Sequence, residues 1–201
     1  MDYFALLNEP RRPWLEPETL KSKFLALAAE AHPDKQHGAN EAEKLAASRR
    51  YAELNAACHC LAEPKLRLLH LLELELGAKP GEVQQIPTAL ADLFADVATR
   101  CRNARDFLVE KGRVTSPMLQ VQWFERAQEQ VEGLRTLQTR LGRLYDQLVE
   151  ELKSLDALWT SKSPSAERTA LLNRLEELYR LFGYFNRWNG QIQELIVQLS
   201  L

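Results

Sequence analysis

Apolar residues recur along this chain at intervals of three and four positions, and they rarely alternate with polar ones. That period is typical of amphipathic α-helices, whereas strict alternation would indicate strands. Glycine and proline are concentrated at a few places between the periodic stretches, where they mark loops. The pattern therefore predicts an all-α protein.

Residues 1–76 divide into four periodic stretches. Pro17 and Pro64 each suit the first turn of a helix, where a backbone N–H would have no helical partner. The helices expected from the pattern are 2–7, 17–31, 41–62 and 64–76. A segment with proline and glycine then marks a linker, which we place at 77–87.

Residues 88–201 predict three longer helices. Serine–proline pairs at 116–117 and 163–164 combine a capping side chain with a proline at the first helical position. A leucine seam runs over 134–155, and a second apolar stripe runs over 171–199. Long amphipathic helices joined by short loops argue for an antiparallel bundle. We interpret both stripes as intramolecular core; self-association through the leucine seam is the alternative.

Two neighbouring residues of the last helix interrupt its stripe. Asn189 falls where an apolar residue is expected, and a buried asparagine costs stability unless it is hydrogen-bonded. Trp188 lies off the stripe, which leaves two placements open: exposure on the surface, or closure of one end of the bundle.

A short motif, His32-Pro33-Asp34 followed by Lys35, separates the second and third expected helices. Proline cannot continue a helix, and it disfavours the α conformation in the residue before it. His32 is therefore expected to leave the helix with its imidazole exposed, and Asp34 to follow on a tight loop. A tripeptide this short occurs by chance, so its meaning depends on the flanking helices.

Those helices and the motif together resemble a J-domain, the module by which DnaJ-type co-chaperones engage a DnaK-class chaperone. The chain is most similar to the HscB-type co-chaperones of iron-sulfur cluster assembly, which also have a helical tail directly after the J-domain. The residues that carry the resemblance are the start Asp2-Tyr3-Phe4, Leu20, Phe24, Leu27, the run 42–47, Tyr51, Leu54, Asn55, Ala57, and 61–72 with Pro64 and Arg67.

The resemblance implies a division of labour along the chain. We predict an N-terminal J-domain (1–76), whose antiparallel helical hairpin carries the loop, then the linker (77–87) and a C-terminal three-helix bundle (88–201). His32, Pro33 and Asp34 would contact the ATPase domain and interdomain linker of a DnaK- or HscA-class chaperone. Such contact favours the hydrolysis-competent state by differential binding.

Positive charge beside the loop would add electrostatic attraction to an acidic chaperone surface. The sequence departs from the family at 28–31, Ala-Ala-Glu-Ala, where the family usually has a basic residue and an aromatic. We therefore expect weak or partner-restricted binding. The cations left to support the contact are Arg11, Arg12, Lys21, Lys23 and Lys35.

In the resembled family, the first helix of the tail binds the iron-sulfur scaffold IscU through a face with leucine, methionine and glutamates. The comparable residues here are Leu90, Leu93 and Phe94, which keep the apolar character but lack the glutamates. A second apolar cluster includes Trp123 and Phe124. We interpret most of these residues as bundle core, and a subset exposed as a patch would mark the client site. A J-domain protein with a different client is the alternative function.

Charge and hydropathy exclude two classes of partner. The net charge is −2, and neither half of the chain is strongly basic, which argues against nucleic acid as the main partner. No apolar run is long enough to span a bilayer, and no leader precedes Asp2. We therefore expect a cytoplasmic protein without a membrane partner.

Cys58, Cys60 and Cys101 fit no disulfide framework, in keeping with a reducing compartment. A metal site at 58–60 is disfavoured, because residues two apart on a helix point to nearly opposite sides. The chain has no nucleophile elbow and no phosphate-binding glycine loop. We therefore predict neither enzymatic activity nor a cofactor or metal. A structural helical module that engages no chaperone remains an alternative, which the departure at 28–31 keeps open.

Overall fold

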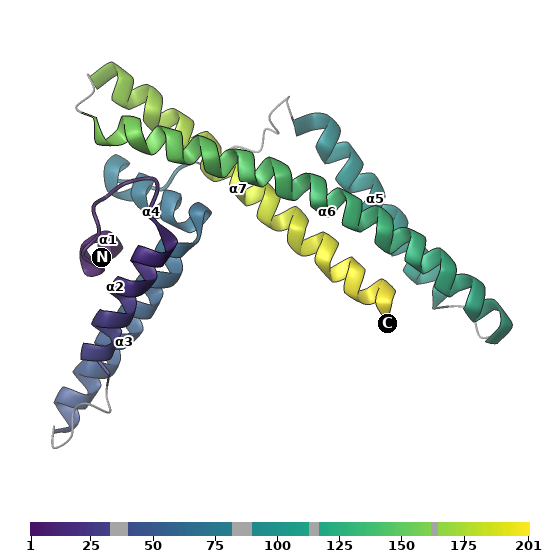
Figure 1. The fold of residues 1–201 in the computed structure, drawn as a ribbon, viewed down its shortest axis with the longest axis horizontal. Coiled ribbons are helices and arrows are strands. Elements are labelled where there is room, and N and C mark those ends of the chain that lie inside the picture. The colour runs from purple at the N-terminus through teal and green to yellow at the C-terminus, as the bar shows by residue number, and fades with distance from the viewer. Residues whose placement is uncertain (33–39, 82–89, 113–116, 162–164) are drawn as a thin grey trace. The chain divides into compact units, whose positions relative to one another are not determined.

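The computed structural model describes residues 1–32, 40–81, 90–112, 117–161 and 165–201. Within these ranges every regular element is an α-helix, so the predicted all-α class is confirmed (Figure 1). No helix in the described ranges is both long enough and apolar enough to cross a bilayer. The helices are α1 (Tyr3–Leu6), α2 (Pro17–Glu30), α3 (Glu41–Ala62), α4 (Pro64–Leu76), α5 (Ala91–Lys111), α6 (Pro117–Thr160) and α7 (Ser165–Ser200).

Local side-chain caps explain why the helix bounds follow the sequence pattern so closely. Asn40 and Glu43 form a capping box at the start of α3, with two hydrogen bonds of 2.9 Å. The Glu63 carboxylate accepts from the Leu66 N–H at 2.7 Å, which caps α4 ahead of its first-turn proline. Gly77 ends α4 in the left-handed conformation, at φ 71°, which glycine adopts without strain.

The chain divides into two compact units. The first comprises Met1–Gly81 and Leu148–Leu181, and the second comprises Glu82–Gln147 and Phe182–Leu201. The long helices α6 and α7 therefore contribute to both units. Each unit has its own buried apolar residues.

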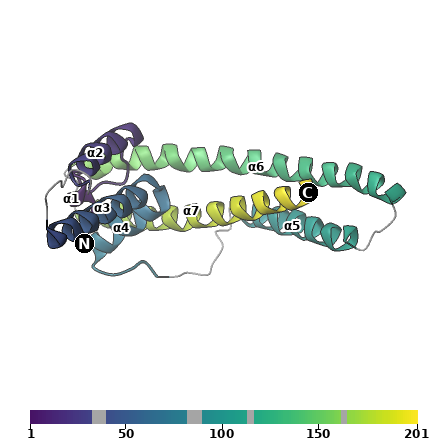
Figure 2. The same cartoon turned by 90° about the horizontal axis from the view of Figure 1, so that it is seen from below.

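The core of the first unit forms where α1, α2 and α4 pack on α3 (Figures 1 and 2). Apolar side chains from all four helices are at most 2% exposed, which removes them from water. They include Phe4, Leu7, Leu20, Leu54, Leu61, Leu68, Leu71 and Leu72.

The core of the second unit forms where α5 packs against α6 up to Gln147 and against α7 from Phe182 onward. The expected stripe of α5 is buried at Leu93, Val97, Cys101 and Ala104, and Phe107 joins it. Facing it are the apolar residues of the two long helices: Ala127, Val131, Leu134, Leu137, Leu141, Phe182, Phe185, Ile192, Leu195 and Leu199.

Trp188 belongs to this core, so exposure on the surface, one of the two placements considered from sequence, was wrong. It is 4% exposed, and its ring lies 5.7 Å from that of Phe185 and 6.1 Å from that of Phe94. The spacing of the helix explains this burial. Phe185, Trp188 and Ile192 are separated by three and four residues and so lie on one face, and the buried stripe is continuous without Asn189. Asn189 is exposed, and its side-chain oxygen accepts from Gln138 at 2.9 Å.

His70 joins α4 to the start of the chain. Its Nε2 accepts a hydrogen bond from the Tyr3 N–H at 3.0 Å, and its ring stacks on Phe4 with centroids 5.7 Å apart. A ring nitrogen can accept only when it is unprotonated. Burial lowers the pKa of His70 below its ordinary 6.5; Asp2 and Glu73 oppose that shift, and the N-terminus and Arg11 add to it.

This arrangement predicts an acid-sensitive first unit. The unfolded chain takes up a proton on His70 near pH 6.5, before the folded chain does, so the free energy of unfolding should fall as pH drops below about 6.5. Urea unfolding between pH 8 and pH 5 measures the slope. His70→Gln, which keeps an acceptor but cannot titrate, should flatten it, whereas His59→Gln on the exposed face of α3 should not. Equal slopes for wild type and His70→Gln would show that another group is responsible.

Candidate functional site

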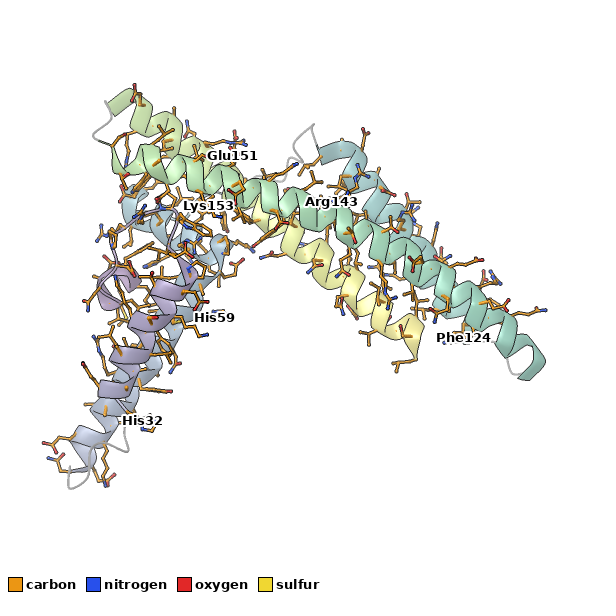
Figure 3. All side chains as sticks on the ribbon, in the orientation of Figure 1. His32, His59, Phe124, Arg143, Glu151 and Lys153 are labelled. Atoms are coloured by element: carbon orange, nitrogen blue, oxygen red, sulfur yellow. The ribbon has the colours of Figure 1, made fainter. Side chains whose placement is uncertain are left out.

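His32 lies at the end of the hairpin formed by α2 and α3 (Figure 3). α2 ends at Glu30, so His32 follows the helix rather than belonging to it, as the sequence predicts. The imidazole is half-buried rather than exposed as expected from sequence, because its ring meets that of Tyr51 on α3 edge-on, with centroids 5.5 Å apart and planes at 85°. The aromatic contact from the neighbouring helix orients the His32 ring.

The rest of the motif falls in the segment 33–39. Pro33, Asp34 and Lys35 therefore lie outside the described residues, and their roles stay predictions. His32 at the end of the hairpin is the part of the motif that the structure describes.

Most of the cations expected to support this loop have anionic partners within the first unit. Besides its ion pair with Glu9, Lys23 donates a hydrogen bond to the Asn8 carbonyl at 3.0 Å, so it holds the segment before α2. Lys21 is exposed and forms no ion pair with a described residue, so it is better placed than Lys23 to attract a partner. The ion pairs are Lys23–Glu9 at 2.8 Å, Arg11–Asp2 at 2.8 Å, and Arg12–Asp156.

The segment between α1 and α2, residues 8–16, is held by the last turns of α6. Asp156 is 4% exposed; its carboxylate accepts from the Trp14 N–H at 3.0 Å and from the Arg12 guanidinium. One helical turn later, the Trp159 indole donates to the Arg11 carbonyl at 2.8 Å. A buried carboxylate with three N–H donors is well satisfied, and it fixes the segment to α6.

Arg67 on α4 holds the same segment. Its guanidinium is buried, with 2% exposed, and donates to the Pro13 carbonyl at 2.7 Å and to the Leu61 carbonyl at 2.6 Å. It also lies over the Trp14 ring, 5.3 Å from the centroid. Leu61 is in the last turn of α3, where carbonyls lack helical donors, so Arg67 stabilises the end of that helix as well.

Helix α7 completes this cluster through Arg168. Its guanidinium pairs with Glu75 of α4 at 2.9 Å and lies 3.3 Å from the centre of the Trp159 ring. Loop 8–16, α4, α6 and α7 are therefore tied together by charged and aromatic side chains inside the first unit. Sequence reasoning missed Asp156, Trp159 and Arg168, because their partners are far along the chain.

The three apolar residues predicted to meet a client have different surroundings in the second unit. Leu93 is 3% exposed and lies in the core. Leu90 is half-buried at the start of α5, and Phe94 is 39% exposed. Of the three, Phe94 offers the most accessible apolar surface.

Two residues of the second apolar cluster lie on α6. Phe124 is 63% exposed (Figure 3), whereas Trp123 packs on Phe107 with ring centroids 4.9 Å apart. The Arg126 guanidinium covers the Trp123 ring at 4.4 Å. Trp123 thus belongs to the packing between α5 and α6, and Phe124 does not.

Burial makes all three cysteine thiols harder to ionise than an exposed cysteine. Burial, with the nearby carboxylates of Glu73 and Glu63, raises the pKa of Cys60 to about 11, and its thiol donates to the Leu66 carbonyl. Burial also raises the pKa of Cys58 and of Cys101. Nucleophilic attack and metal ligation both use the thiolate, which a raised pKa disfavours. Within the described ranges, no three His, Cys, Asp or Glu residues are grouped as metal ligands would be.

Comparison with known proteins connects this architecture to one group of solved structures. No family model matches the sequence. The chaperone HscB from Vibrio cholerae aligns with 99% of this chain and 99% of its own length, at a TM-score of 0.60 and 21% identity. The human co-chaperone protein HscB aligns with 96% of this chain and 81% of its own length, at a TM-score of 0.61 and 15% identity. The chain therefore has the fold of the HscB co-chaperones over nearly its whole length.

Proposed function

We propose that this protein is a J-type co-chaperone that stimulates ATP hydrolysis by a DnaK- or HscA-class chaperone. One observation carries the proposal: a histidine that precedes Pro33-Asp34 lies at the end of the α2–α3 hairpin, in a chain with the HscB fold. In this role the protein performs no chemistry itself. It binds the hydrolysis-competent state of the chaperone more tightly than the other state and so shifts the equilibrium toward it.

The proposed contact joins His32 to the residues of the following loop. The Tyr51 ring restricts the orientations of the imidazole, which lowers the entropy lost when a partner hydrogen-bonds to it. Asp34 would pair with a cation of the chaperone, and Pro33 would fix the loop. Lys21 and Lys35 would supply attraction at the rim, which mainly affects the rate of association.

His32→Gln tests this contact. A hydrogen bond to a charged partner is worth about 1.5–3 kcal/mol. The substitution should therefore raise the concentration of this protein that gives half-maximal stimulation of steady-state ATP hydrolysis by about ten-fold or more. His59→Gln is the matched control: it is the same replacement, at an exposed position on α3 of the same unit (Figure 3), and it should leave stimulation unchanged. Equal stimulation by His32→Gln and wild type would contradict the assignment.

We further propose that the C-terminal helices present a client, and that an iron-sulfur cluster scaffold of the IscU type is the first candidate. The full chain is the appropriate bait for a binding assay, because Leu148–Leu181 belong to the compact unit of the N-terminal helices. Retention of the organism's own scaffold protein by the immobilised chain is expected. Failure to retain it would favour the second candidate, a J-type protein with another client.

A further inference from the structure

A groove runs between α5 and α7 in the second unit. Its volume is about 380 Å³, and its walls come from both helices. The apolar part is formed by Phe94, Val97 and Trp188, with the Tyr184 ring stacked near Trp188 at 5.8 Å. Phe94 is 39% exposed, so this part of the groove presents aromatic surface to solvent.

Three arginines line the same groove. Arg102 and Arg105 come from α5 and Arg187 comes from α7; all three are exposed, and none forms an ion pair with a described residue. Among the described lining residues, Asp106 is the one anion. Two uncompensated positive charges therefore remain at the groove, although the chain as a whole carries −2.

Two arginines outside the groove differ from those that line it. Arg100 of α5 and Arg140 of α6 both pair with Asp96, at 3.0 Å and 3.3 Å, outside the groove. Each of these two arginines therefore has an anionic partner, although they share one carboxylate, whereas Arg102, Arg105 and Arg187 have none among the described residues. Charge left unpaired beside exposed aromatic surface is complementary to a partner that carries anions next to an apolar side chain.

We propose that this groove binds an acidic segment of a protein partner, with an apolar side chain of that segment against Phe94 and its carboxylates at Arg102, Arg105 and Arg187. The proposal rests on the client-presenting role of the C-terminal helices and specifies the chemistry of the client. A protein segment fits better than a nucleic-acid strand, which needs a longer track of cations.

A labelled peptide of about twelve residues, in which Glu and Asp alternate with Leu, is the probe. Fluorescence anisotropy should show binding to the full chain that weakens as salt rises. Arg105→Glu combined with Arg187→Glu should weaken binding by about ten-fold or more, because two attractions become repulsions. Arg143→Glu, the same change at an exposed position of α6 outside the groove (Figure 3), should change it by less than about two-fold.

Several outcomes would overturn the assignment. Equally tight binding of a peptide in which every acidic residue is replaced by Lys would show that charge does not drive binding. Equally tight binding of a peptide in which every Leu is replaced by Ser would show that the apolar contact does not contribute. Tighter binding of a single-stranded oligonucleotide would identify another class of partner. Equal weakening by Arg143→Glu would place the site elsewhere. If wild type stimulates the ATPase but does not bind the peptide, the groove proposal alone is refuted. If wild type does not stimulate the ATPase, the proposed function is refuted.

Discussion

Replacing Asp156 by alanine is expected to lower the free energy of unfolding of the first unit by about 2–3 kcal/mol. The substitution removes the acceptor of the Trp14 N–H and leaves the Arg12 guanidinium without its carboxylate. Arg12 is partly exposed and can regain water, which keeps the loss below that of a fully buried pair. Urea unfolding followed by tryptophan fluorescence measures the effect, since Trp14 and Trp159 both lie at this contact.

Two further variants separate this contact from a general effect of mutating α6. Glu150→Ala removes an exposed ion pair between Glu150 and Lys153, which both belong to α6. This change should lower the free energy of unfolding by less than about 0.5 kcal/mol. Asp156→Asn keeps an oxygen acceptor but loses the charge, so it should retain part of the stability. An unfolding midpoint of Asp156→Ala that matches wild type would show that α6 does not hold the segment 8–16.

Arg67→Ala should destabilise the first unit more strongly, by about 3–5 kcal/mol. The change opens a cavity in the core and leaves the carbonyls of Pro13 and Leu61 without their donor. It also removes the cation over the Trp14 ring. Thermal or urea unfolding measures the loss, and the variant is expected to be partly unfolded at temperatures at which wild type is folded.

Arg67→Lys distinguishes geometry from charge. Lysine keeps the positive charge, but a single ammonium on a flexible stem cannot copy the planar guanidinium that reaches two carbonyls at once. We expect recovery of less than half of the loss. Full recovery by lysine would mean that charge at this position matters and that the two hydrogen bonds do not.

Sequence alone predicted the helices well where the signals are local. The bounds of α3 and α4 follow from the capping residues Asn40 and Glu63 and from Gly77, all within a turn of the helix that they cap. Trp188 was placed off the apolar stripe because the three-and-four spacing of apolar residues was continued to Asn189. In the structure the buried residue at that turn of the helix is Trp188.

The charged contacts of the first unit could not be predicted from sequence. Asp156 accepts from Trp14 across 142 residues of chain, and Arg67 donates to Pro13 across 54. No local pattern distinguishes such residues from the solvated charges that cover most amphipathic helices. The same limit applies to the groove: Arg105 and Arg187 come from different helices, and their shared surface requires the packing of α5 on α7.

Single-turnover hydrolysis of ATP by the organism's DnaK-class chaperone tests the co-chaperone assignment most directly. The chaperone is first shown to be competent by its response to another J-domain protein. Adding increasing amounts of this chain should then accelerate hydrolysis saturably, by about ten-fold or more, because binding favours the hydrolysis-competent state. A hydrolysis rate that stays at its basal value, at every concentration of the chain and for each DnaK-class chaperone of the organism, would contradict the proposal that His32 and its loop engage such a partner.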